Sequence, residues 1–223
     1  MPRLIASYGR RHGRRLRPGK LTLIETLLPQ LEIKLLETGM VEPSSLFEQK
    51  KPIWFEIGYG GGEHLAHQAA LYPEANFIGC ETYVDGIASM LSHINEAGLK
   101  NIRLFTEDAR LLMERLPDKS LERVFVLYPD PWPKTRHHKR RIISKDFLEE
   151  LTRLMTNGAQ LRLATDYADY ATWMLERLLS HPQFEWTART CDDWLNPWAD
   201  WISTRYEQKA LAGRPTYLNF IRK

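Results

Sequence analysis

Cysteine is scarce in this chain of 223 residues. The two cysteines, Cys80 and Cys191, lie far apart in the sequence and form no Cys-x-x-Cys motif. This spacing argues against a zinc site and against a disulfide framework. It fits a reducing compartment, so we expect a cytoplasmic protein that binds no metal.

Long apolar runs are missing as well. No segment approaches the ~20 consecutive apolar residues that a transmembrane helix needs. The arginine-rich start is followed by Pro18 and Gly19, where a signal peptide would have its apolar segment. We therefore expect neither export nor membrane insertion. A composition of 43% hydrophobic and 26% charged residues suits one sizeable globular domain.

Acidic residues are absent from two segments that are rich in basic ones. Residues 1–20 contain seven Lys and Arg, residues 134–145 contain six, and neither segment contains Asp or Glu. The rest of the chain has 18 basic and 28 acidic side chains, although the formal net charge of the whole is +3. Such runs are often solvated faces. Two of them on an acidic body favour polyanion binding that weakens steeply with added salt.

Strand and helix patterns alternate along most of the chain. Short apolar runs predict strands at 52–57, 76–80, 102–105, 124–128 and 159–164, with weaker candidates at 185–188 and 216–221. Helical spacing predicts helices at 21–28, 63–71, 85–97, 109–116, 145–155 and 167–179. Asn157-Gly158 predicts a turn, and residues 190–215 predict a long irregular loop of functional importance. The alternation predicts an α/β fold with a mostly parallel sheet covered on both faces.

A glycine-rich turn follows the first expected strand, in the order Glu56-Ile-Gly58-Tyr-Gly60-Gly-Gly62. Glycines permit a tight turn and a close ligand, and the start of the next helix offers free N–H groups. A dinucleotide fingerprint would have its third glycine at the position of Glu63. The pattern is nearer to that of S-adenosylmethionine sites, whose sulfonium cation benefits from carboxylates and aromatic faces.

Acidic residues also end the second and third expected strands. Glu81 is suitably placed to accept hydrogen bonds from ribose hydroxyls, and Asp108 to accept one from an adenine amino group. Each is equally suited to be the N-cap of the helix that follows. Together with the glycine turn, they predict a cofactor site at the carboxyl ends of the strands.

The fourth expected strand leads into the stretch Tyr128-Pro-Asp-Pro-Trp-Pro-Lys134. Prolines bias the residues before them, Asp130 and Trp132, toward extended backbone. Ligands bind at this end of an open α/β sheet, which makes Asp130 a candidate site residue. Trp132 either stacks on a base taken out of its helix or packs over the end of the sheet.

Residues 129–141 resemble the signature of bacterial tRNA (guanine-N7-)-methyltransferases, which reads roughly P-D-P-W-x-K-x-R-H-x-K-R-R. The resemblance extends to residues 10–14, 56–62, 163–166 and 204–209, of which only the first would be a weak match by itself. The resemblance implies a Rossmann-like class I methyltransferase fold with a seven-stranded sheet. It also implies methyl transfer from S-adenosylmethionine to N7 of a guanosine in the tRNA variable loop.

The resemblance further implies an organisation and a set of residue roles. A basic arm, residues 1–25, contacts tRNA and is free to move, and residues 26–223 form a single methyltransferase domain. The protein is a monomer or homodimer with no obligatory protein partner. Asp130 is the implied catalytic residue. The implied cofactor contacts are Glu56, Gly58, Gly60, Glu81, Asp108 and Asp130; the substrate contacts are Lys134, Asp166, Thr204, Arg205, Tyr206 and Glu207; and the RNA contacts are Arg136, His137, His138, Lys139, Arg140 and Arg141.

The implied reaction needs no general base, because guanine N7 has an in-plane lone pair and no hydrogen. Its rate then comes mainly from alignment of N7, the methyl carbon and sulfur. Asp130 or Asp166 stabilises the positive charge that moves onto the base, or Asp130 binds the N1–H and the exocyclic amine of guanine. Alternatives are another RNA nucleobase methyltransferase, an inactive RNA-binding protein of the same fold and, more distantly, a nicotinamide-dependent dehydrogenase.

Overall fold

Three parallel strands form the sheet of the first of two compact units, Met1–Pro117. They are β1 (Ile53–Ile57), β2 (Asn76–Cys80) and β3 (Ile102–Phe105), with β2 paired to both of the others. Every residue of β1 and β2 is buried. Burial on both faces explains why these strands appear in the sequence as nearly continuous apolar runs.

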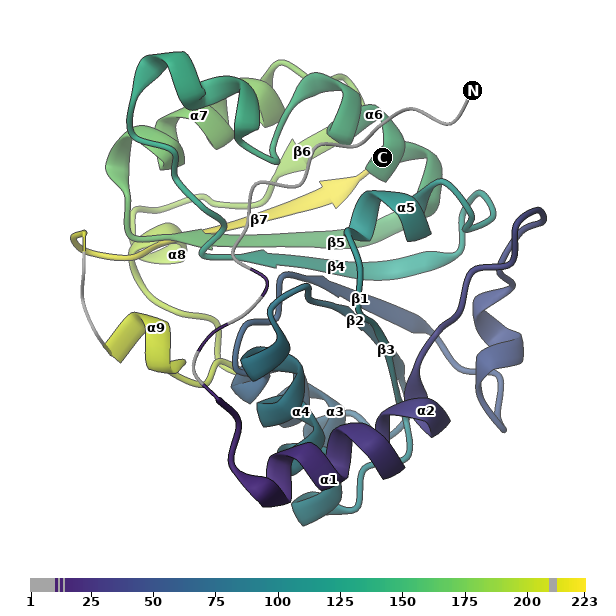
Figure 1. The fold of residues 1–223 in the computed structure, drawn as a ribbon. Coiled ribbons are helices and arrows are strands. Elements are labelled where there is room, and N and C mark those ends of the chain that lie inside the picture. The colour runs from purple at the N-terminus through teal and green to yellow at the C-terminus, as the bar shows by residue number, and fades with distance from the viewer. Residues whose placement is uncertain (1–10, 12, 14, 209–211) are drawn as a thin grey trace. The chain divides into compact units, whose positions relative to one another are not determined.

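The helical elements of the first unit precede, connect and follow its strands. They are α1 (Pro18–Thr26), α2 (Leu28–Leu31), the 3₁₀ helix η1 (Pro43–Leu46), α3 (Glu63–Leu71), α4 (Val84–Ala97) and α5 (Ala109–Met113). Figure 1 shows α3 and α4 on one side of β1, β2 and β3, and α5 on the other side. Helix α1 begins with a proline at its first position, which suits a helix start, and packs on α4.

Four strands form the sheet of the second unit, Asp118–Lys223. They are β4 (Leu121–Leu127), β5 (Met155–Thr165), β6 (Phe184–Trp186) and β7 (Thr216–Arg222). β4 is parallel to β5, whereas β7 runs antiparallel to both β5 and β6. The helical elements of this unit are the 3₁₀ helix η2 (Thr135–Arg140), α6 (Lys145–Leu154), α7 (Ala168–Leu179), α8 (Asp192–Leu195) and α9 (Arg205–Gln208).

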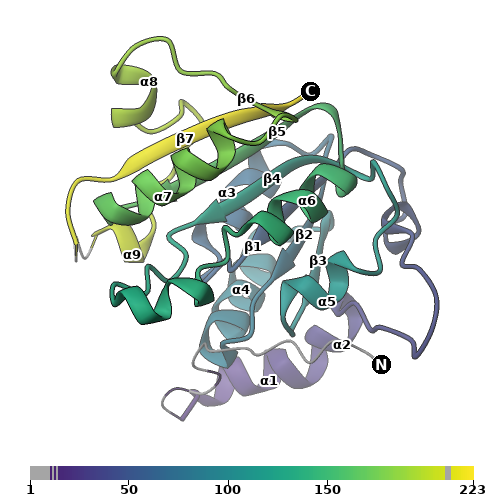
Figure 2. The same ribbon diagram turned by 90° about the horizontal axis from the view of Figure 1, so that it is seen from above.

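The strands of the second unit are covered by helices on one face and by a long connection on the other. Figure 2 shows α6 and α7 in front of β4 and β5. Helix α6 begins at Ser144, whose hydroxyl accepts a hydrogen bond from Phe147 N at 3.3 Å. On the other face, the rings of Trp198 and Trp201 lie 5.6 and 5.4 Å from that of Tyr217. Trp198 and Trp201 therefore take part in packing.

One predicted turn is wrong. Asn157 and Gly158 lie inside β5 and do not reverse the chain. The pairing with β4 shifts there, because Leu121 lies opposite Met155 whereas Arg123 lies opposite Gln160. Gly158 has φ of 84°. Its freedom to adopt positive φ permits a bulge within the strand.

The structure is a computed structural model that describes residues 11, 13, 15–208 and 212–223. Over the chain the strand order is β3-β2-β1-β4-β5-β7-β6, and the pairings within each unit are parallel apart from those of β7. This confirms the predicted mostly parallel seven-stranded sheet with helices on both faces. In the described ranges, no helix has the length and apolarity that a membrane crossing requires.

Candidate functional site

The glycine turn of the first unit exposes its backbone. Gly58, Gly60 and Gly62 have φ of 72°, 56° and 85°, in the left-handed region that glycine tolerates. Gly58 and Gly60 are exposed, and no atom of the described residues lies within 4 Å of where a side chain would begin on either. A ligand can therefore approach the main chain directly.

Glu81 holds this turn in shape. Its Oε2 accepts a hydrogen bond from Gly60 N at 2.8 Å, and its Oε1 accepts from Thr82 N at 2.8 Å and Tyr83 N at 2.9 Å. A side chain at Gly86 in α4 would approach Gly60 O to 2.3 Å, so only glycine lets the helix lie this close. The carboxylate at the end of β2 thus lies beside the glycine turn and fixes its backbone.

Glu56 is buried within β1 and has a partner that sequence analysis missed. His64 Nδ1 lies 2.7 Å from Glu56 Oε2, and the two residues are 1% and 2% exposed. The turn between them returns the chain so that the second residue of α3 lies beside the strand. A separation of eight residues gives no periodic signal, so this pair becomes visible only once the turn is folded.

Asp108 is the N-cap of α5, the alternative that the sequence left open. Its Oδ1 accepts from Arg110 N at 3.1 Å and Arg110 Nε at 2.9 Å, and its Oδ2 lies 2.7 Å from Arg110 Nη2. Burial by itself would raise the pKa of Asp108, but the hydrogen bonds and charge of Arg110, with a smaller contribution from Arg11, lower it overall. Both carboxylate oxygens are thus engaged by the protein.

In the second unit, Asp130 lies in a turn with unusual backbone. Tyr128 and Trp132 have φ of 48° and 44°, which costs non-glycine residues about 1–3 kcal/mol each. The expectation of extended backbone at Trp132 is therefore wrong. The chain turns there into η2, and the guanidinium of Arg140 lies 4.9 Å from the centre of the Trp132 ring. One face of this indole is already covered by a cation.

Two carboxylates of the second unit have no partner among the residues that the structure describes. Asp166, which follows β5, is only 6% exposed, and its Oδ2 is buried without a hydrogen bond. Asp130 is exposed, yet nearby protein atoms partly desolvate its carboxyl group, and this raises its pKa. The pKa of Tyr206 is raised by burial and then by the negative charges of Asp166 and Asp130. Both carboxylates therefore lie within electrostatic reach of this phenol.

Hydrogen bonds of two side chains, Thr204 and Glu207, hold residues 204–208 in place. Thr204 Oγ1 accepts a hydrogen bond from Glu207 N at 3.3 Å. Glu207 accepts from Trp201 Nε1 at 3.0 Å and from the hydroxyl of Tyr217. Arg205 and Tyr206 are exposed, and the Tyr206 ring lies 5.3 Å from that of Tyr128. Lys209, the last residue of the matched motif, lies outside the described residues.

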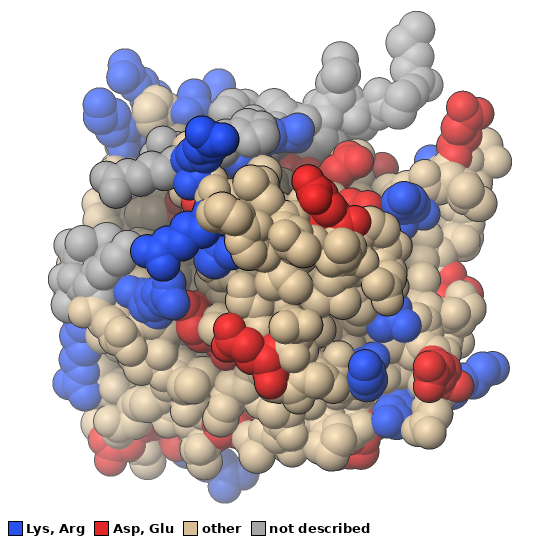
Figure 3. Space-filling model, turned by 60° about the horizontal axis from the view of Figure 1, so that its bottom comes forward, with Lys and Arg blue, Asp and Glu red and all other residues tan. Residues whose placement is uncertain are grey.

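The predicted RNA contacts differ in exposure. Lys134, Arg136 and Lys139 are exposed, whereas His137, His138 and Arg140 are half-buried. Partial desolvation and the surrounding positive charges lower the pKa of His137. Figure 3 shows one face of the molecule, on which Lys and Arg side chains lie toward both edges with Asp and Glu side chains between them.

Arg141 differs from the other five residues of this set. It is 2% exposed, and its side chain faces the interior of the second unit. Unlike an open RNA contact, this guanidinium already donates to the protein itself, to Pro131 O from Nε and to Asp169 from Nη2. Nothing in the sequence separates Arg141 from Arg140, so its burial could not be predicted.

The first basic segment lies mostly outside the described residues, which include only Arg11, Arg15, Arg17 and Lys20 of its basic side chains. The backbone oxygen of Arg11 accepts a hydrogen bond from Val84 N at 3.0 Å, so this part of the segment lies against the start of α4. In the described part of the chain, no group of three or more His, Cys, Asp and Glu is arranged to hold a metal ion.

Comparisons with known proteins identify the family of this chain. A family model described as "Putative methyltransferase" matches residues 50–218. The chain is 47% identical over 222 residues to a tRNA (guanine-N(7)-)-methyltransferase of Rhodospirillum rubrum, covering 97% of this chain and 87% of the relative. It is 48% identical over 220 residues to the protein of that name from Paramagnetospirillum magneticum, covering 97% and 92%.

Solved structures of low identity share the fold. A 16S rRNA methyltransferase, KamB, aligns with a TM-score of 0.56 and 16% identity, covering 81% of this chain and 91% of that one. An rRNA methylase from Streptococcus thermophilus aligns with a TM-score of 0.54 and 11% identity, covering 77% and 87%. The sequence matches extend over nearly the whole chain at identities far above these. The chain therefore belongs to the tRNA (guanine-N(7)-)-methyltransferase family.

Proposed function

We propose that this protein transfers a methyl group from S-adenosylmethionine to N7 of a guanosine in the variable loop of tRNA. Family membership supports both the reaction type and the RNA substrate. Two carboxylates of the second unit, Asp130 and Asp166, lack partners among the described residues and support a site for a nucleobase. Cytoplasmic localisation, oligomeric state and the identity of the methylated position stay predictions.

The cofactor is proposed to bind the first unit at the glycine turn. The open backbone at Gly58 and Gly60 suits a ligand that lies against the main chain. Glu81, at the end of β2 beside the glycine turn, is proposed to accept from the ribose hydroxyls, and Glu56 to favour the positive charge of the cofactor. Asp108 is the least free of these candidates, because Arg110 already occupies both its oxygens.

The buried carboxylate of Asp166 is the single observation that carries the proposal. Leaving a buried polar atom without a hydrogen bond costs about 1–3 kcal/mol, and more for a charged group. Asp166 Oδ2 is in this state at the carboxyl end of β5. The N1–H and exocyclic amine of guanine are two adjacent donors that would satisfy it. We propose that Asp166 binds this edge of the base.

Asp130 is proposed to stabilise the positive charge that forms on the base during methyl transfer. Attack by N7 moves positive charge from sulfur onto the imidazole portion of guanine, and a fixed carboxylate stabilises that charge. Asp130 is more exposed than Asp166, and partial desolvation raises its pKa. Lys134 and Arg136 to Arg140 are proposed to bind phosphates, with Tyr206 as an aromatic surface for the extracted base.

Mass spectrometry of tRNA nucleosides tests this proposal. Purified protein is incubated with tRNA and S-adenosylmethionine labelled in the methyl group, and we expect 7-methylguanosine as the labelled product. A transcript in which 7-deazaguanosine replaces guanosine serves as the matched control, because it lacks the N7 lone pair. It should bind the protein and accept no methyl group.

Other results would favour the alternatives. Label on adenine or cytosine would indicate another nucleobase methyltransferase. Binding of tRNA without any labelled product, together with no heat of S-adenosylmethionine binding in a calorimetric titration, would indicate an RNA-binding protein without activity. Binding of NAD in the same titration would favour a dehydrogenase.

A further inference from the structure

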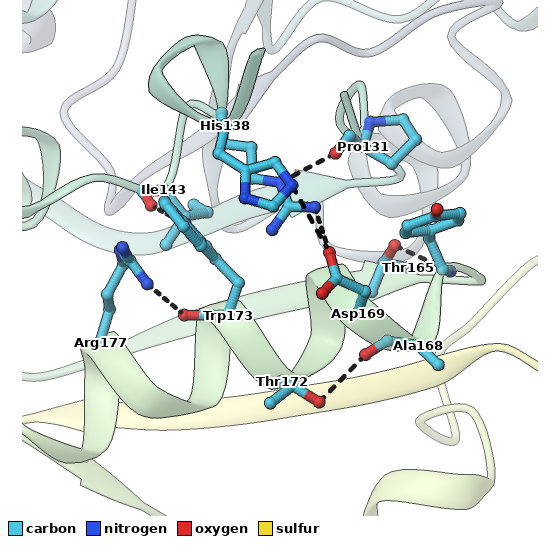
Figure 4. A network of polar contacts seen from close by, with 11 residues as sticks. Pro131, His138, Ile143, Thr165, Ala168, Asp169, Thr172, Trp173 and Arg177 are labelled. Atoms are coloured by element: carbon cyan, nitrogen blue, oxygen red, sulfur yellow. Dashed lines mark hydrogen bonds and ion pairs between the residues drawn. The ribbon is translucent and has the colours of Figure 1, made fainter. Parts of the chain in front are cut away.

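The guanidinium of Arg141 is the most deeply buried cationic group near the Asp130 turn. Its side chain is 0% exposed, although it ends a run of basic residues. Its Nε donates a hydrogen bond to the carbonyl oxygen of Pro131 at 2.9 Å, and its Nη2 donates to Oδ2 of Asp169 in the first turn of α7. Figure 4 shows Pro131 and Asp169 facing the same region from the turn and from the helix, with His138 above Asp169.

Two aromatic side chains of α7 enclose the same guanidinium. Its central carbon lies 4.9 Å from the centre of the Tyr170 ring and 4.8 Å from that of Trp173. Both rings are themselves tied to Ile143, because Trp173 Nε1 donates to Ile143 O at 2.7 Å and Ile143 N donates to Tyr170 OH at 3.4 Å. The guanidinium therefore lies in a closed compartment with fixed walls.

The Pro131 carbonyl belongs to the residue directly after Asp130, within a turn that has left-handed backbone on both sides. Such a turn keeps its shape only where its surroundings hold it. We propose that Arg141 is a positioning residue that fixes the Asp130 turn on α7 and does not contact RNA. This inference rests on the proposed function, in which Asp130 takes part in methyl transfer.

The geometry requires an arginine. Two N–H groups of one planar guanidinium donate in two directions, while its flat faces lie against aromatic rings. A lysine ammonium offers a point charge and cannot reproduce the two donations together with the stacking. The negative charge of Asp169 also neutralises the cation, so Arg141 adds little to the field that attracts phosphate.

Two substitutions in the full-length protein separate positioning from RNA contact. Arg141→Lys keeps the charge and loses the geometry, and Arg136→Met removes an exposed cation of the same segment. For Arg141→Lys we expect a fall of about 10²-fold in the single-turnover rate at saturating tRNA and cofactor, as small misplacements of reacting groups cause. The dissociation constant for tRNA and its salt dependence should stay unchanged. Arg136→Met should weaken tRNA binding and lower the salt slope by about 1.

Arg153→Met is the matched structural control. Arg153 lies in the same unit and has two ionic partners, at 2.7 Å from Asp118 and 2.6 Å from Glu150. It lies in α6, and both of these partners are outside the Asp130 turn. Its substitution should lower the melting temperature and leave the single-turnover rate unchanged, so a general loss of stability is distinguished from a loss of positioning.

The inference is overturned if Arg141→Lys leaves the rate unchanged, or if it weakens tRNA binding and lowers the salt slope as Arg136→Met does. Should Arg141→Lys fail to fold, Asp169→Ala gives the second test, because it removes one anchor of the guanidinium and retains Arg141. We expect a slower rate with unchanged tRNA affinity, and an unchanged rate overturns the inference. A wild-type protein that forms no 7-methylguanosine overturns the proposed function and this inference together.

Discussion

The candidate-site carboxylates at or near strand ends differ between the two units in how far the protein already satisfies them. In the first unit, Glu56 has His64 as its partner, Glu81 accepts three backbone hydrogen bonds, and Asp108 is paired with Arg110. In the second unit, Asp130 and Asp166 have no hydrogen-bond partner among the described residues. Both sets lie at or near the carboxyl ends of strands.

This difference teaches how the two sites are built. Carboxylates of the first unit shape a rigid backbone surface, so a cofactor would meet groups whose positions are already set. Those of the second unit retain acceptor capacity, which costs stability when the group is buried. An enzyme that must hold a base only while it reacts benefits from acceptors that the base itself satisfies. The contrast makes predictions of opposite sign for stability.

The largest effect is expected from Asp130→Asn. The substitution keeps the shape of the side chain and removes its charge. We expect the methyl-transfer rate at saturating substrates to fall by ~10²–10³-fold, as for loss of an electrostatic group aimed at a transition state. Single-turnover kinetics with labelled cofactor measures this rate. Unchanged methylation together with unchanged RNA affinity would show that Asp130 has no part in the site.

Asp166→Asn sharpens the comparison, because activity and stability should move in different directions. Loss of a charged acceptor for guanine should lower kcat/KM by ~10–10²-fold, equivalent to about 1.5–3 kcal/mol. The free energy of unfolding should stay the same or rise, because a buried charge without a partner is removed. Urea denaturation and steady-state kinetics measure the two quantities. A clear loss of stability would mean that the Asp166 carboxylate has a hydrogen-bond partner within the protein and is not available to the base.

His64→Gln tests a carboxylate of the first unit, Glu56, by removing its partner. In contrast to Asp166→Asn, this substitution should lower the stability of the protein. Removing the partner of buried Glu56 should lower the free energy of unfolding by about 1–3 kcal/mol and weaken cofactor binding. His67→Gln, on the same helix and half-buried, is the matched control and should change neither. Calorimetric titration with S-adenosylmethionine and thermal denaturation give the two readouts. Equal effects of both substitutions would contradict a specific role for the pair.

The smallest effect concerns pH. The pKa of Asp130 is raised by desolvation, so activity that needs its charge should disappear as pH falls through a value above the ordinary ~3.9. The pKa of Asp108 is lowered, so its contribution to stability is present above its unfolded value and is lost only as pH falls through the lower folded value. Activity should therefore end at a pH where circular dichroism still reports a folded protein. Coincident loss of both would refute this ordering.

The sequence allowed much of the fold to be predicted, because burial on both faces makes β1 and β2 continuous apolar runs and glycine marks the turn after β1. Asp166 could also be predicted as a site residue, because it follows a strand within a recognisable motif. The left-handed backbone conformations in the Asp130 turn could not be predicted. Trp132 precedes a proline and was expected to be extended, but contacts made after folding hold it in a left-handed conformation.

Side-chain partners across a turn were equally beyond prediction. Glu56 and His64 are eight residues apart and meet only because three glycines reverse the chain. Arg140 and Arg141 are chemically identical neighbours. The guanidinium of Arg140 nevertheless lies over the Trp132 ring, whereas that of Arg141 is fully buried against Asp169 of α7. Composition and spacing describe a charged segment as a whole, whereas the direction of each side chain depends on the packing around it.

A double-mutant cycle on enzyme and substrate tests the central claim most directly. Wild-type protein and Asp166→Asn are compared on tRNA that carries either guanosine or inosine at the methylated position, since inosine retains N7 and lacks the exocyclic amine. If Asp166 is held free to accept from guanine, loss of the amine should slow the wild-type protein and slow the variant far less, giving a coupling of about 0.5–3 kcal/mol. Equal and additive losses in the two proteins would contradict the claim.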